Sequence, residues 1–158
     1  MKQGISLIFI LLAIYFWNNT PAPFESKDRA FYCDAQYVAN TRFANQYVDT
    51  KVNSTIIFPK SDDGVIFSTG TLTFKGETFM VNRDDYYTTL PSEITGISKV
   101  TISSERIKSR DNTPNAVWNQ AVLPAATGIT YYAGVVRLNE HLILIRTLTK
   151  PLMVCISR

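Results

Sequence analysis

Residues 64–87, GVIFSTGTLTFKGETFMVNRDDYY, have the pattern of one long antiparallel β-hairpin. Lys75 and Gly76 lie at its centre. Gly supplies the positive φ that a two-residue hairpin turn needs, although Lys suits the first turn position poorly. A turn at these two residues fixes the register of the hairpin. The predicted pairs are Thr73 with Thr78, Leu72 with Phe79, Thr71 with Met80, Gly70 with Val81 and Thr69 with Asn82.

The two faces of this hairpin differ in chemical character. Leu72, Phe79 and Val81 share one face, whereas the other face is mostly hydroxylic. Alternation with period two is typical of an antiparallel sheet that buries one face and leaves the other to water or a ligand. The simpler interpretation is a structural hairpin without a function of its own.

Length and composition indicate one globular domain. The chain has 158 residues, of which 46% are hydrophobic, so it can bury a sizeable core. Its net charge of +3 does not resemble the dense basic stripe of a phosphate-binding surface. We therefore expect no direct contact with nucleic acid.

An apolar run near the N-terminus, residues 4–17, is either a membrane anchor or a cleavable signal peptide. At 1.5 Å per residue it covers about 20 Å of a roughly 30 Å hydrocarbon core, which favours a signal. The best cleavage pattern ends at Ala22, however, and Pro23 follows it. Aromatic residues 15–17 also suit a membrane interface. On balance these features favour an uncleaved transmembrane helix.

The predicted layout has three parts: a cytoplasmic stub with the anchor (residues 1–17), a linker (residues 18–29) and a periplasmic β domain (residues 30–158). Lys2 is the only charge before the anchor, so the positive-inside rule places the N-terminus in the cytoplasm.

The two cysteines, Cys33 and Cys155, predict one disulfide between the first and last strands if the domain is in an oxidising compartment. Such a bridge would stabilise the fold by roughly 4 to 5 kcal/mol. In a cytosolic domain they would instead be two separate buried thiols. With His141 as the only histidine, these residues cannot build a zinc site.

The remaining pattern predicts a mainly β domain with one short helix. Further strands are expected over residues 30–39, 46–58, 99–110, 127–138, 142–148 and 152–156, and the helix over residues 111–123. Thr113 is the expected helix cap, Pro114 the first helical residue, and Trp118 a packing residue.

Three local patterns refine this prediction. Alternation breaks at residues 84–85, which indicates a bulge or a strand end. Residues 142–145, LILI, are apolar on both faces, so that strand is either covered on both sides or lines an apolar cavity. Arg106, Lys108 and Arg110 would place three cations on one strand face, either solvated or docked on an acidic partner or on lipid headgroups.

The sequence contains no recognisable catalytic motif. There is no G-x-S-x-G elbow, no H-E-x-x-H helix, no P-loop and no dinucleotide fingerprint. We predict that the protein is not an enzyme and has no catalytic residues, metal ligands or cofactor. His141 is a candidate pH sensor, although a buried carboxylate with a raised pKa could serve as well.

The sequence resembles the FidL-like, PsaF (MyfF)-like and ToxS-like accessory membrane proteins, which accompany membrane-anchored transcription regulators in enteric bacteria. The matching features are Gly70-x-Leu72, Gly76, Val81-Asn82-Arg83, Leu123-Pro124 and Val154-Cys155 paired with Cys33. The resemblance implies a lipocalin-like antiparallel β-barrel, incomplete in that group, behind a single-pass anchor in the bacterial inner membrane. It assigns no ligand-binding residues.

The implied function is that of a periplasmic sensory or stabilising subunit. It would form a heterodimer with a winged-helix transcription regulator and help it respond to a bile-like amphiphile or acid pH, controlling virulence or fimbrial genes. The alternatives are a fimbrial subunit, which predicts a β-sandwich lacking a strand, and a free periplasmic lipid-binding carrier, which predicts a closed barrel. Both alternatives predict a cleaved signal.

Overall fold

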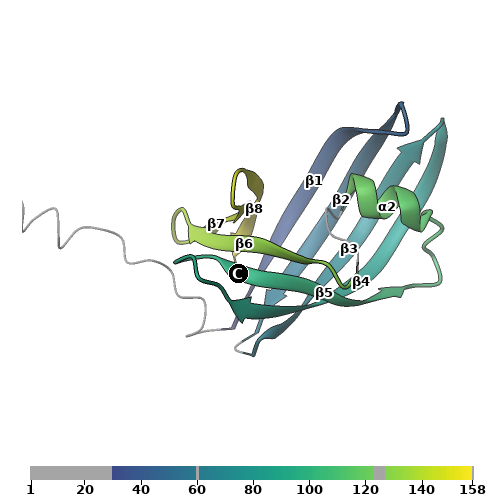
Figure 1. Cartoon of the computed structure of the whole chain (residues 1–158). Coiled ribbons are helices and arrows are strands. Elements are labelled where there is room, and N and C mark those ends of the chain that lie inside the picture. Colours follow the sequence, from purple (N-terminus) through teal and green to yellow (C-terminus); the bar gives the residue numbers. More distant parts are fainter. Residues whose placement is uncertain (1–29, 60, 123–126, 158) are drawn as a thin grey trace, which may run out of the picture.

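The computed structural model describes residues 30–59, 61–122 and 127–157. In this part of the chain, eight antiparallel strands form a closed barrel in which the strand order follows the chain (Figure 1). The strands are β1 (Phe31–Phe43), β2 (Gln46–Phe58), β3 (Asp63–Phe74), β4 (Glu77–Pro91), β5 (Ser98–Ile107), β6 (Thr130–Arg137), β7 (Leu142–Thr147) and β8 (Pro151–Ser157). The helix α2 (Asn115–Ala121) lies between β5 and β6.

The predicted central hairpin is confirmed as β3 and β4. Phe74 pairs with Glu77 across the turn, and all five predicted pairs are present. The bulge predicted at residues 84–85 is not there: Tyr86 pairs with Ser104 and Tyr87 with Ile102, so the extra residue is Ser103 on β5. The alternative of a strand end there is wrong, because β4 continues to Pro91.

Both residues of the β3–β4 turn have positive φ, 56° at Lys75 and 81° at Gly76. This backbone conformation is costly for most L-residues, but Asn tolerates it. We expect Lys75→Asn to be more stable than Lys75→Ala by about 1 kcal/mol in urea unfolding. Both variants lose the contact between Lys75 and the Phe74 ring, so the comparison isolates the turn. Equal stability of the two variants would contradict this account.

The barrel is tall on one side and short on the other. β1 pairs with β2 along its whole length, but with β8 only at Cys33 and Asp34. β5 and β6 share four pairs. The resemblance implied an incomplete barrel, whereas the described strands close a ring over part of its height. Cys33 and Cys155 form the predicted disulfide close to the pairing of β1 with β8, with a Cα–Cα distance of 5.4 Å.

Helix α2 lies beside the upper part of the long strands, beyond the point where the short strands end (Figure 1). Its Val117, Trp118 and Ala121 are buried against inward-facing residues of the tall side. Those partners are Val48, Val52, Leu72 and Val81. A second apolar cluster fills the closed part of the barrel and includes the disulfide. The tall strands would otherwise expose their inner face, so the helix completes the core.

Several predicted bounds need correction. The first strand ends at Phe43, four residues later than expected, and the helix has seven residues. Pro114 is the residue before the helix, and the Thr113 hydroxyl donates to the Met80 carbonyl and makes no cap. The helix begins later than predicted because the segment before it, residues 111–113, is hydrogen-bonded to Met80 and Asn82 of β4.

The predicted three-cation strand face is also wrong. β5 ends at Ile107, so Lys108 and Arg110 lie beyond the strand. Arg106 and Lys108 both form ion pairs with the buried carboxylate of Asp84. Part of the positive charge is therefore neutralised locally.

Among the described residues, no helix has the length and apolar character needed to cross a membrane. The predicted anchor within residues 1–17 and the linker, residues 18–29, lie outside the described part of the chain.

Candidate ligand cavity

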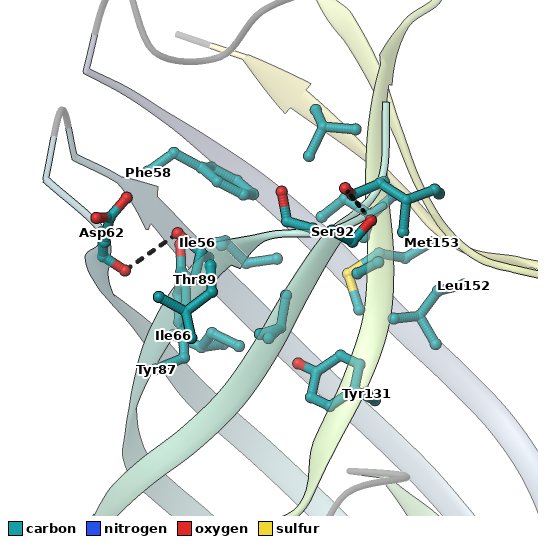
Figure 2. Close-up of a pocket in the computed structure, with 18 of the residues that line it drawn as sticks. Ile56, Phe58, Asp62, Ile66, Tyr87, Thr89, Ser92, Tyr131, Leu152 and Met153 are labelled. Carbon is teal, nitrogen blue, oxygen red and sulfur yellow. Dashed lines mark hydrogen bonds between the residues drawn. The ribbon is translucent and has the colours of Figure 1, made fainter. Parts of the chain in front are cut away.

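A cavity of about 470 Å³ occupies the interior of the barrel (Figure 2). Its wall is mostly apolar, because inward positions of the strands carry aliphatic and aromatic side chains. Lining residues include Ile56, Ile66, Val100, Val135, Ile145 and Met153. The strand predicted to be apolar on both faces, residues 142–145, contributes Ile145 to this wall. Ile143 and Ile145 are buried, whereas Leu142 and Leu144 are half-buried.

A few hydroxyl groups interrupt the apolar wall. Tyr87 donates its hydroxyl to the Ile57 carbonyl at 2.8 Å, and the Ser54 and Ser68 hydroxyls lie 3.2 Å apart. Burial raises the pKa of Tyr131 to about 12, with a further contribution from the charge of Asp85. These groups therefore stay neutral at physiological pH and offer hydrogen bonds without a charge.

The cavity reaches the end of the barrel where β1 begins. Phe31 pairs with Phe58, their rings stack at 4.5 Å, and Phe58 lines the cavity. The β4–β5 segment forms the opposite rim, where the Ser92 hydroxyl donates to the Ile97 carbonyl at 2.8 Å. Across this end, Thr89 donates its backbone N–H to the Asp62 carbonyl at 2.7 Å. We refer to this end of the cavity as the mouth.

Size and chemistry suit a small amphiphile. The volume lies within the range of roughly 300 to 1,000 Å³ typical of small-molecule sites, and such sites are mostly apolar with a few placed polar groups. Asp62, at the mouth, is the only acid or base among the described lining residues. An apolar body could fill the interior while a polar end stays at the mouth.

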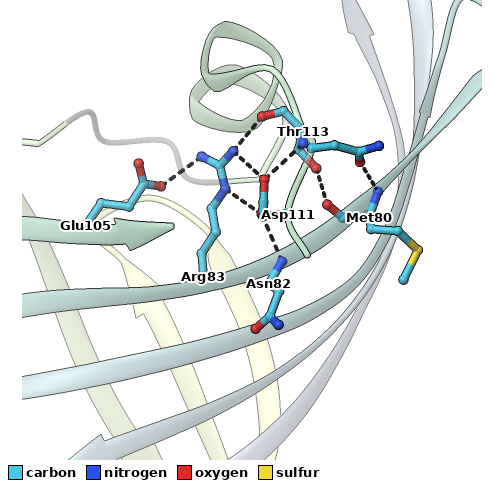
Figure 3. Close-up of polar contacts among 7 residues, drawn as sticks. Met80, Asn82, Arg83, Glu105, Asp111 and Thr113 are labelled. Carbon is cyan, nitrogen blue, oxygen red and sulfur yellow. Dashed lines mark hydrogen bonds and ion pairs between the residues drawn. The ribbon is translucent and has the colours of Figure 1, made fainter. Parts of the chain in front are cut away.

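Trp118 of α2 lines the deep end of the cavity and packs against a buried arginine, Arg83. Figure 3 shows the polar partners of this arginine. Arg83 on β4 makes a bidentate ion pair with Asp111, with Nε to Oδ2 at 2.9 Å and Nη2 to Oδ1 at 3.0 Å. Its Nη1 donates to Glu105 at 3.0 Å, and Nη2 also donates to the Thr113 carbonyl at 2.6 Å. The guanidinium lies 5.2 Å from the centre of the Trp118 ring.

Asp111 links this arginine to the backbone. Its carboxylate accepts the N–H groups of Asn82 and Thr113 at 2.8 and 2.9 Å. Burial would raise the pKa of Asp111, but the hydrogen bonds from Arg83 and these N–H groups hold it below its usual value. The carboxylate stays ionised and fixes the segment before α2 against β4.

A second buried carboxylate has no such support. Asp85 is fully buried and lies directly across from Glu105 on β5. Neither carboxylate oxygen of Asp85 has a hydrogen-bond partner in the described structure. Burial, followed by the negative charge of Glu105, raises the pKa of Asp85 to about 7. Asp85 therefore exchanges its proton near neutral pH.

The sequence-predicted site residues have different outcomes. Cys33 and Cys155 are paired, as described above. His141 is exposed in the turn between β6 and β7 and is not among the residues that line the cavity. Its proposed part in pH sensing stays a prediction. In the described part of the chain, no group of His, Cys, Asp or Glu is placed to hold a metal ion.

Sequence reasoning did not find the Arg83 cluster. Asp111 and Glu105 lie 28 and 22 residues from Arg83, so no local pattern joins them. One signal was available, because Arg83 follows Val81 on the inward phase of β4. A charged residue at such a position requires buried partners.

Comparison with protein families gives a match. Residues 70–155 match the family described as "FidL-like putative membrane protein". This stretch includes most of the sequence features on which the predicted resemblance rested, and it confirms that resemblance. A search of curated proteins finds no match.

Proposed function

Because the chain belongs to the FidL-like family of membrane proteins, we propose that it is a periplasmic accessory subunit that binds a small amphiphile inside its barrel. We further propose that it forms a heterodimer with a membrane-anchored winged-helix transcription regulator at the bacterial inner membrane. Its regulator would control virulence or fimbrial genes. The cavity is the observation that carries this proposal.

The cavity favours a rigid amphiphile of the bile-acid kind. Such a molecule has an apolar body with a few hydroxyls, and the wall offers neutral hydroxyl partners at Ser54, Ser68 and Tyr131. Its anionic end would be poorly matched to the interior, because burying an unpaired charge is costly. That end is therefore expected at the mouth.

The upper part of β1 offers a place for the partner. Residues 36–43 pair with β2, and no other described strand pairs with them. Helix α2 contacts this stretch at Tyr37, whose hydroxyl donates to the Ala121 carbonyl at 3.3 Å. Beyond Tyr37, an unpaired strand edge presents backbone groups to which an extended segment of another protein can add. Val38 on this edge is 64% exposed. We propose this edge as the contact for the regulator's periplasmic domain.

A cavity-filling substitution tests ligand binding. Ala133 lines the cavity and is half-buried, so Ala133→Phe places a ring in empty space. We expect this variant to bind deoxycholate at least tenfold more weakly, a loss of about 1.4 kcal/mol, in isothermal titration calorimetry. Met80→Phe, on the exposed outer face, is the matched control and should bind normally. Absence of saturable binding by the unmodified protein would refute the ligand proposal.

A free lipid-binding carrier is the second candidate, because the barrel is closed. A pull-down from solubilised membranes with intact-mass analysis separates the two. Recovery of the full-length chain with a single-pass DNA-binding protein supports the accessory role. Recovery of a cleaved chain without that protein supports the carrier. The fimbrial alternative predicted a β-sandwich, and the barrel disagrees with it.

A further inference from the structure

The rim of the mouth carries exposed aliphatic side chains. Leu90 is 59% exposed and Ile94 is 45% exposed, and Pro91 between them is also exposed. All three line the mouth on the β4–β5 side. Exposed apolar groups gathered at an opening are typical of a surface that meets another apolar surface.

The chain enters the barrel at the same end, across the mouth from this rim. β1 begins at Phe31, which pairs with Phe58 at the mouth. The preceding sequence holds the apolar run, residues 4–17, and then residues 18–29. Twelve residues span at most about 40 Å, which limits how far the mouth can lie from that run. The family is described as "FidL-like putative membrane protein", and if residues 4–17 are the predicted anchor, this length keeps the mouth within about 40 Å of lipid.

The charges near the mouth indicate which lipid surface fits. Asp62 and Asp63 are exposed there, whereas Glu93 and Lys99 neutralise each other in an ion pair at 2.8 Å. An acidic rim is repelled by anionic headgroups. Contact must therefore rely on insertion of apolar side chains into neutral lipid.

We infer that the mouth docks on neutral lipid of the membrane through Leu90, Pro91 and Ile94, so that an amphiphile enters the cavity directly from the bilayer. The docking is inferred from the exposed apolar side chains of the rim and from the position of Phe31, where the chain enters the barrel at the mouth. Entry of an amphiphile additionally rests on the proposed function.

Lipid contact can be measured on the full-length chain in phosphatidylcholine proteoliposomes. Leu90→Cys and Ile94→Cys carry an environment-sensitive fluorophore, which reacts with the new thiol because Cys33 and Cys155 are paired. Tyr47→Cys is the control: Tyr47 is 66% exposed and lies near the opposite end of β1 and β2. We expect nitroxide-labelled lipids to quench the probes at 90 and 94 several times more strongly than the probe at 47.

Two outcomes overturn the docking. One is equal quenching at all three positions. The other is a shifted emission at 90 and 94 without quenching by lipid, since this indicates that protein covers the rim. Replacing part of the lipid with phosphatidylglycerol is expected to reduce the quenching, and a marked increase would refute the neutral-lipid assignment.

The route of entry needs a second measurement. The double variant Leu90→Ser/Ile94→Ser is expected to slow the uptake of a fluorescent bile acid from vesicles by a larger factor than it weakens equilibrium binding from solution, since both residues also line the mouth. An unchanged uptake rate refutes entry from the bilayer. If the unmodified chain binds no bile acid from solution, the proposed function fails, and lipid quenching at 90 and 94 still decides the docking.

Discussion

Replacing Arg83 by methionine is expected to lower the free energy of unfolding by about 3 to 5 kcal/mol, because removing one member of a buried ion pair leaves its partners buried and unpaired. The Asp111 side chain is 1% exposed and that of Glu105 is 16% exposed. Asp111 would keep its two backbone hydrogen bonds but lose the opposite charge. Urea unfolding of the two proteins measures the difference.

The matched control is Arg106→Met. Arg106 also pairs with an aspartate, but its side chain is 62% exposed, and Asp84 keeps Lys108 as a partner. Because Asp84 is itself buried, some stability should be lost, but Lys108 still neutralises its charge, so this variant should lose clearly less stability than Arg83→Met. If both variants lost the same free energy of unfolding, Arg83 would contribute no more to stability than Arg106.

A double variant separates charge burial from packing. Arg83→Met combined with Asp111→Leu removes both charges, so it should recover part of the stability lost in Arg83→Met alone. Hydrogen exchange in α2 should quicken in the single variant, because Arg83 holds the Thr113 carbonyl just before the helix. Slow exchange there would mean that apolar contacts of Trp118 alone secure the helix.

The fold could be predicted from the sequence where the signal is local. Period-two alternation and Gly76 set the β3–β4 register. The break in apolar character at Asp84 and Asp85 was misleading, because β4 keeps its alternation there and the bulge is at Ser103 on β5. Closure of the barrel depends on pairing between Cys33 and Ser157, which are distant in sequence, so strand patterns alone could not show it. The different heights of its two sides also depend on pairing between distant strands, so they could not be predicted either.

The cavity could be predicted only in part. Alternation shows which side chains face inward, but it does not show whether they fill the interior. The β7 pattern indicated either a covered strand or a cavity wall, and the structure gives the wall to Ile145. Likewise, adjacent residues on a strand face opposite sides of the sheet, but the burial of both Asp84 and Asp85 could not be foreseen. Asp84 has cationic partners and Asp85 has none, because β5 places Arg106 and Glu105 on opposite sides of the sheet.

That unsupported carboxylate leads to an expected pH dependence of stability. The pKa of Asp85 is about 7 in the folded protein and about 3.8 in an unperturbed chain. Between these values the folded state binds a proton that the unfolded state has lost, so stability falls as pH rises. The loss from pH 4 to neutral pH is expected to approach 4 kcal/mol, by the conversion of about 1.4 kcal/mol per pKa unit.

Other charged groups near Asp85 shape the curve. Glu105 faces it from β5, Tyr131 from β6, and Arg83 and Asp84 lie on its own strand. Asp84 and Asp111 have lowered pKa values, despite burial, because cations and hydrogen bonds hold them ionised. The stability that these two carboxylates contribute is lost as pH falls, because the unfolded state then binds protons that the folded state does not. Stability is therefore expected to peak at mildly acidic pH.

Asp85→Asn removes the titrating group with little change in shape. We expect urea unfolding to show nearly constant stability between pH 4 and 7 in this variant, and higher stability than the unmodified protein at pH 7. Asp63→Asn, at an exposed position, should leave the slope unchanged. A slope that survives in Asp85→Asn would assign the pH dependence to other groups. A slope that disappears would give the proposed acid response a physical origin in the barrel interior, away from the exposed His141.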